Sequence, residues 1–210
     1  MGASEGVDWE TVVGVTLAFL KFMLGYYGLS SDAGQTAVPT TSVTAIYRVR
    51  EAQQGPLVVK TLQARLDYLS IDGQVSLDGD SRIRLQASLP EPTTDRLRQL
   101  TQPGRLTAQY EGRELLGSQD FVAAVPAEHS GVKIVLSERG RREWAEATAE
   151  LVGEKVSLVL DGEVLMAPIV RQAMTGGELL VTSANGDCEN LIFSINGGSL
   201  PCELELLELR

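Results

Sequence analysis

The segment from Val156 to Val170 constrains the fold of this chain more than any other part of the sequence. Two apolar runs, 156–160 and 164–170, flank the dipeptide Asp161-Gly162. A tight hairpin turn needs positive φ angles, which glycine adopts without steric cost, so an Asp-Gly pair between apolar runs predicts a β-hairpin. We therefore expect two antiparallel strands joined by a bend that is scaffold.

The second half of the chain contains further regular elements around this hairpin. Ser137 is placed to cap a helix over 138–152, and Trp144 is expected in the core on one face of that helix. A last helix is expected to end at Gly197-Gly198. Strands are predicted at Val132–Leu136, Glu178–Thr182 and Leu204–Leu209.

The first half of the chain alternates predicted strands and helices. Leucines at 62, 66 and 69 form one stripe of a helix over 60–71. Strands are predicted at 44–49, 74–77, 82–89 and 106–110, and a second helix at 95–100. This order favours an α+β fold, with helices on one face of antiparallel or mixed sheets.

A series of short motifs points to a known family. Thr148 and Gly153 are followed by Leu160-Asp161-Gly162, and then, in order, by Ala167-Pro168, Gly176-Gly177 and Gly198-Ser199-Leu200-Pro201. This series resembles the head region of the first periplasmic domain of the protein-translocase subunit SecD. More loosely, 62–69 and 85–90 resemble its base region, although Leu-Pro-Glu-Pro stands where the family usually has Leu-Pro-Gly.

The resemblance implies a ferredoxin-like base plus a SecD-head-like subdomain, and the apolar composition near the N-terminus predicts a helix that precedes them. We expect five parts along the chain. They are an apolar helix (1–30), a linker (31–42), a base-like α+β region (43–116), a connecting loop (117–131) and a head-like α+β region (132–210).

The segment from Thr11 to Leu29 is apolar on every helical face and just long enough to span a bilayer. Lys21 is unfavourable in the middle of such a span unless it reaches the interface or meets a partner. A membrane anchor, a helix packed on a partner and a cleaved signal therefore remain alternatives. The residues expected to contact membrane or partner are Trp9, Phe19, Lys21, Phe22, Tyr26 and Tyr27.

Charge and residue types exclude several classes of function. The net charge of −10 disfavours nucleic acid as a partner, because its phosphates are bound by Lys and Arg. The single histidine, His129, lies in a polar stretch without a nucleophile motif. Cys188 and Cys202 are expected to be two buried thiols, with pairing in an oxidising compartment as the alternative. We expect no catalytic, cofactor or metal site, and no enzyme.

Binding or assembly remains. The first hypothesis is a non-enzymatic, SecD-like extracytoplasmic domain of a bacterial membrane, tethered by 11–29, that binds polypeptide or assists a membrane protein complex. Its candidate binding residues are the apolar second arm of the hairpin, unless that arm is the centre of a sheet: Leu165, Met166, Ala167, Pro168 and Ile169. The alternative is a structural subunit of a larger assembly, with the apolar helix packed against other subunits.

Overall fold

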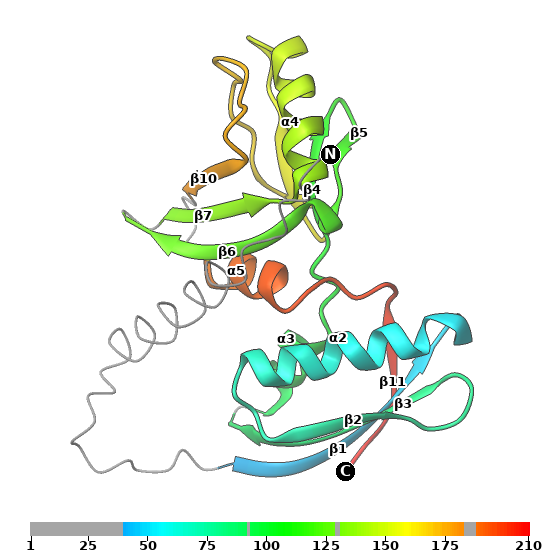
Figure 1. Cartoon of the computed structure of the whole chain (residues 1–210). Helices are drawn as coiled ribbons and strands as arrows, with labels where there is room; N and C mark the ends of the chain where they lie inside the picture. The colour runs from blue at the N-terminus through cyan, green and yellow to red at the C-terminus, as the bar shows by residue number, and fades with distance from the viewer. Residues whose placement is uncertain (1–39, 92, 129–130, 183–187) are drawn as a thin grey trace, which may run out of the picture. The chain divides into compact units, whose positions relative to one another are not determined.

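The computed structural model describes residues 40–91, 93–128, 131–182 and 188–210, which form three antiparallel sheets and four α-helices (Figure 1). One sheet with helices α2 and α3 makes up the base. The other two sheets with α4 and α5 make up the head. Mixed α+β architecture is therefore confirmed for the described part of the chain.

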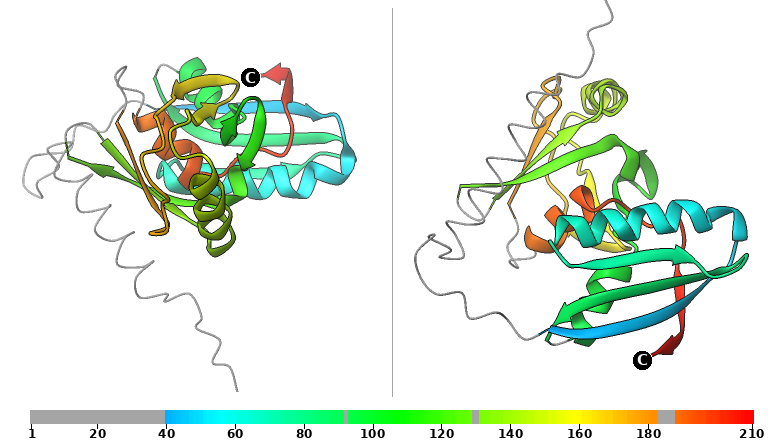
Figure 2. Two further views of the ribbon diagram at one scale, coloured as in Figure 1. Left: turned by 90° about the horizontal axis from the view of Figure 1, so that it is seen from above. Right: turned by 60° about the horizontal axis from the view of Figure 1, so that its bottom comes forward.

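The base is a four-stranded sheet with the order β11-β1-β3-β2. Its element order along the chain is strand, helix, strand, strand, helix, strand, which is the ferredoxin-like arrangement. Figure 2 shows α2 lying across one face of this sheet. The elements are β1 (Thr40–Val49), the short 3-10 helix η1 (Ala52–Gln54), α2 (Gly55–Tyr68), β2 (Gly73–Leu77), β3 (Arg82–Pro90), α3 (Thr93–Thr101) and β11 (Leu204–Leu209).

Alternation along the base strands produces its core. Ala45 and Tyr47 on β1 and Leu85 on β3 are buried, whereas the residues between them are more exposed. The predicted leucine stripe of α2 packs on this face, with Leu62 and Leu66 fully buried. Burial of these apolar side chains is the main stabilising term of the base.

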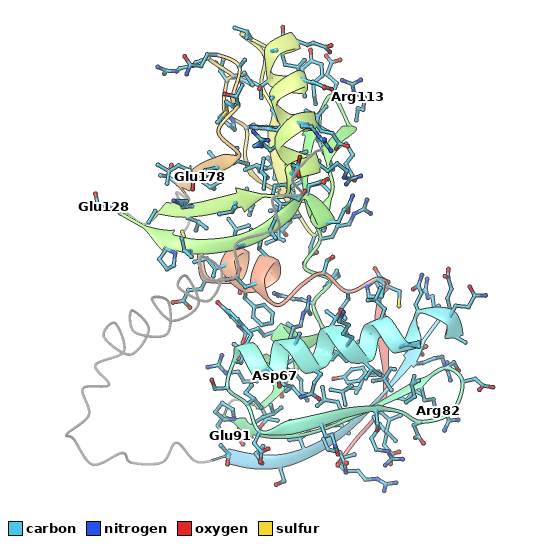
Figure 3. The ribbon with its side chains drawn as sticks, viewed as in Figure 1. Asp67, Arg82, Glu91, Arg113, Glu128 and Glu178 are labelled. Atoms are coloured by element: carbon cyan, nitrogen blue, oxygen red, sulfur yellow. The ribbon has the colours of Figure 1, made fainter. Side chains whose placement is uncertain are left out.

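The head contains two antiparallel sheets, with orders β5-β4-β8-β9 and β10-β7-β6. Charged side chains decorate the outside of head and base, as the labelled Arg113, Glu178 and Arg82 illustrate (Figure 3). The elements are β4 (Leu106–Tyr110), β5 (Arg113–Leu116), η2 (Ser118–Asp120), β6 (Phe121–Ala127), β7 (Gly131–Leu136), α4 (Glu138–Glu150), β8 (Ser157–Leu160), β9 (Glu163–Met166), β10 (Glu178–Thr182) and α5 (Cys188–Asn196).

Local sequence signals in the head are confirmed where they rest on backbone chemistry. The Ser137 hydroxyl accepts a hydrogen bond from the Gly140 amide at 3.0 Å and caps α4. Trp144 is 6% exposed and lies in the core. Asp161 and Gly162 have φ angles of 50° and 89°, so the predicted hairpin bend has positive φ at both central residues.

The expected connecting loop over 117–131 is wrong, because β6 occupies Phe121–Ala127. Its sequence lacks a clear alternation and contains Pro126, which argues against a central strand. β6 is an edge strand, where the missing backbone donor of a proline is tolerated. It forms a strand because it pairs with β7, and the local sequence does not indicate this pairing.

The expected boundaries between base and head are also corrected. β4 pairs with β8 and so belongs to the head, while β11 pairs with β1 and closes the base sheet. The head is thus inserted between α3 and β11. Strand pairing between distant segments decides membership, and sequence order does not reveal it. The expected linker is shorter as well, because β1 begins at Thr40.

The expected N-terminal helix, with Trp9, Phe19, Lys21, Phe22, Tyr26 and Tyr27, lies outside the described residues, as does His129. Within the described ranges, every helix is too short or too polar to cross a bilayer.

Candidate functional site

The apolar arm, which we define as Val164–Ile169, lies at the edge of a head sheet. β9 is the last strand of the order β5-β4-β8-β9 and has a neighbour on one side only. Val164 is 62% exposed and Ile169 is 54% exposed, and Ala167 and Pro168 are exposed between them. The alternative that this arm is the centre of a sheet is therefore wrong.

The five candidate residues of the sequence analysis are brought together in this arm but differ in exposure. Leu165 and Met166 are half-buried, whereas Ala167, Pro168 and Ile169 face solvent. Val164 was missed, although it belongs to the same apolar run. A strand edge with uncovered apolar side chains is a site that another polypeptide can extend by backbone pairing.

Backbone pairing holds the arm in place along its whole length. Within the hairpin, Val159 pairs with Val164 and Leu158 with Met166, with an irregularity between the two pairs. Beyond β9, the Val156 amide donates to the Pro168 carbonyl at 3.1 Å. The Val170 amide donates to the Glu154 carbonyl at 2.9 Å. The exposed apolar side chains therefore lie on ordered backbone.

The Asp161 side chain ties the bend of this hairpin to the chain entering the head. Its carboxylate accepts hydrogen bonds from the Gly104 amide at 3.0 Å and from the Arg105 amide at 2.7 Å. The Asp161 amide donates back to the Arg105 carbonyl at 3.0 Å. The bend is scaffold, as expected, but the role of its carboxylate was missed because the acceptor and its donors are far apart in sequence.

Arg65 of α2 is a fully buried charge, 0% exposed. Its guanidinium donates hydrogen bonds to backbone carbonyls of four residues: Leu100 and Gln102 at 2.6 Å each, Pro103 at 3.2 Å and Gly198 at 2.6 Å, with a second bond to Gly198 at 3.2 Å. A buried charge is costly unless such hydrogen bonds compensate it.

Burial lowers the pKa of Arg65 to about 10, and attraction to the Asp161 carboxylate acts in the opposite direction. The guanidinium therefore remains charged at neutral pH. Sequence reasoning missed Arg65 although a signal exists. It stands three residues after Leu62 and one before Leu66, on the same buried stripe of the helix.

A second buried charge stabilises the start of α4. Asp120 is 1% exposed, and its carboxylate accepts from the Arg139 guanidinium at 2.7 Å and from the Gly117 amide at 3.0 Å. The hydrogen bond and charge of Asp120 raise the pKa of Arg139. This pair anchors η2 to the helix and is structural.

The described residues contain no group of three His, Cys, Asp or Glu side chains arranged to hold a metal ion. Cys188 and Cys202 are only partly buried, so the expectation of two buried thiols is wrong. Burial of the Cys202 thiol, with a smaller contribution from the Glu51 charge, raises its pKa. A raised pKa makes a thiol less reactive at neutral pH.

Fold and site together define a class of protein: an α+β domain with a ferredoxin-like base, an inserted head and an exposed apolar strand edge. The sequence model of the SecDF P1 head subdomain matches residues 102–202. These residues are similar to a SecDF P1 head subdomain, and the match supports a SecD first periplasmic domain.

Two protein translocase subunits are similar to this chain in sequence. The protein translocase subunit SecD of Acidaminococcus fermentans is 35% identical over 106 residues, which are 48% of this chain and 25% of that protein. The protein translocase subunit SecDF of Thermus thermophilus is 31% identical over 81 residues, which are 38% of this chain and 11% of that protein. The chain thus spans a quarter or less of the length of these two relatives.

Solved structures share the fold. A crystal structure of SecDF in a super-membrane-facing form has a TM-score of 0.73 at 19% identity, over 97% of this chain and 35% of the SecDF chain. A structure described as that of a membrane component SecDF that enhances protein export has a TM-score of 0.71 at 20% identity. That match covers 80% of this chain and 99% of the other.

Proposed function

We propose that this chain is a non-enzymatic, SecD-type domain that works outside the cytoplasm and binds extended polypeptide as an accessory to protein translocation. The observation that carries the proposal is the apolar arm, Val164–Ile169, held at the open edge of a head sheet. Related chains are named protein translocase subunits, and one related structure is described as enhancing protein export.

The arm has the chemistry that an extended polypeptide requires. An unpaired strand edge supplies backbone donors and acceptors that any sequence can match, and its apolar side chains bury apolar side chains of the incoming strand. Affinity then depends on extended backbone and apolar content more than on a particular sequence. Natively folded proteins keep most of their strands paired and most of their apolar side chains buried, so they should bind more weakly.

A titration tests this activity. A fluorescently labelled, permanently unfolded polypeptide is titrated with the full chain in mild detergent, and a folded protein of similar size and charge serves as the control. We expect saturable binding of the unfolded probe alone. Equal affinity for both probes, or no binding at high micromolar concentration, contradicts the proposal.

We also propose that residues 11–29 tether the chain to the membrane. The motivation is their length and apolar composition, together with the description of SecDF as a membrane component. Cell fractionation followed by alkaline carbonate extraction tests the tether. Protease added to intact spheroplasts tests the side, since an extracytoplasmic domain is digested. Release by carbonate, or full protection from protease, is the contrary result.

A structural subunit of a larger assembly is the second candidate, and the base favours it. β11 is an edge strand, and Leu206, Leu207 and Leu209 on it are 49%, 36% and 48% exposed. Uncovered apolar edge strands invite pairing with another chain or domain. Size-exclusion chromatography with light scattering separates the candidates: a defined large particle favours assembly, and a monomer in detergent favours the tethered binding domain.

A further inference from the structure

The polypeptide passes between base and head twice, and the two crossings lie against each other. The first crossing follows α3 and comprises residues 102–105, and the second follows α5 and comprises residues 197–203. The Leu200 amide donates a hydrogen bond to the Pro103 carbonyl at 2.8 Å and joins them. Any independent opening of one part must disturb this junction.

Arg65 reaches both crossings from the base. Its donors bind the carbonyls of Gln102 and Pro103 on the first crossing and of Gly198 on the second. Its charged group also lies 5.3 Å from the centre of the Phe193 ring, on helix α5 of the head. One side chain thus contacts the base, both crossings and the head.

Glycines in both crossings make this approach possible. A Cβ added at Gly104, where φ is +67°, would lie 2.9 Å from the Arg65 guanidinium. A Cβ added at Gly197 would lie 3.0 Å from the Arg65 Cγ. Glycine backbone therefore lies close to the arginine on both crossings, which lets carbonyl oxygens take the place of water.

Asp161 holds the first crossing from the head side. Its carboxylate binds the Gly104 and Arg105 amides, while Arg65 binds the carbonyls of the preceding residues. The carbonyl groups of this crossing therefore accept hydrogen bonds from the Arg65 cation of the base. Its amide groups donate hydrogen bonds to the Asp161 anion of the head. A hollow of about 250 Å³ lies beside Gly104 and Gly198.

We propose that Arg65 and Asp161 form a polar clamp on the two crossings that makes base and head unfold as one cooperative unit. Opening the head alone would pull the Gly198 carbonyl away from a buried guanidinium and leave the charge incompletely hydrogen-bonded. A buried charge that loses its hydrogen-bond partners destabilises a protein more than an apolar residue at the same site would. The clamp therefore links the stability of the base to that of the head.

Hydrogen–deuterium exchange of the full chain, measured by mass spectrometry at increasing urea, tests the clamp. In the natural protein, the slowest amides of β3 in the base and of β7 in the head are expected to share one urea dependence. In Arg65→Gln, amides of β7 are expected to exchange at least about tenfold faster than those of β3. The control is Arg98→Gln, which removes a guanidinium from a side chain that is 77% exposed.

Two further variants keep the test decisive if Arg65→Gln does not fold. Asp161→Asn keeps a residue that tolerates positive φ but removes the charge, and is expected to separate the two exchange profiles in the same direction by a smaller factor. Arg65→Lys keeps the positive charge but has fewer hydrogen-bond donors, so it should also separate the two exchange profiles. The clamp is refuted if the folded variants keep one common urea dependence, or if the natural protein already shows two.

Discussion

Replacing the exposed aliphatic residues of the arm tests its role most directly. Val164 and Ile169 are 62% and 54% exposed. Complete burial of such a side chain contributes about 1.5–3 kcal/mol, so the exposed fraction leaves roughly 1–2 kcal/mol per residue for a bound polypeptide to gain. Because burial in a complex is incomplete, Val164→Ser with Ile169→Ser should weaken binding by roughly 2–3 kcal/mol, or about 30- to 150-fold.

Fluorescence anisotropy with a labelled unfolded polypeptide measures this loss. Thermal unfolding followed by circular dichroism should change little, since exposed substitutions usually alter stability by no more than about 0.5 kcal/mol. Leu180→Ser is the matched control, because Leu180 is 66% exposed but lies on β10 in the other head sheet. Unchanged affinity of the double variant, or an equal loss in Leu180→Ser, would refute the reasoning.

Three further predictions concern stability. Gly140→Ala should lower the urea midpoint: alanine favours helix by about 1 kcal/mol, but its Cβ would lie 2.8 Å from the Asp120 Cβ, and overpacking costs about 1–3 kcal/mol. Leu62→Ala, at a fully buried site, should cost about 2–5 kcal/mol, whereas Leu77→Ala, at a site 47% exposed, should cost about 1 kcal/mol or less. Burial raises the pKa of Tyr47 from 10.0 to about 12. Between pH 10 and 12 the folded state therefore keeps a proton that the unfolded state loses, and the free energy of unfolding falls as pH rises through this range.

Urea unfolding measures all three. A Gly140→Ala variant as stable as the natural protein would mean that η2 shifts to accommodate the added Cβ without loss of stability. Equal losses for the two leucine variants would contradict the packing of α2. For Tyr47, the decline of the unfolding free energy above pH 10 should diminish in Tyr47→Phe, which cannot ionise; an unchanged decline would assign it to other groups.

Short-range chemistry was predictable where one or two residues determine the backbone. The Asp161-Gly162 pair predicts its hairpin because few other residue pairs adopt positive φ angles at both positions. Ser137 predicts the start of α4 because its hydroxyl satisfies an amide of the first turn. The candidate arm was found for a similar reason, since its apolar run is continuous in the sequence.

Pairing between distant segments was not predictable in this way. β6 carries a proline that a central strand would not accept, and only its place at a sheet edge makes it a strand. The exposure of the arm likewise depends on which strand lies next to β9. Nothing within the run itself distinguishes an edge from the centre of a sheet.

The amino-acid order by itself determined the α+β class, the hairpin bend, the helix caps and the motif series of a SecD-type head, because these depend on neighbours a few residues apart. Tertiary structure alone decided that β11 closes the base sheet, that the arm is an open edge, and that Arg65 lies among the carbonyls of Gln102 and Gly198. The physical reason is that pairing and burial bring together groups from remote positions, and their free energy depends on partners that local sequence does not specify.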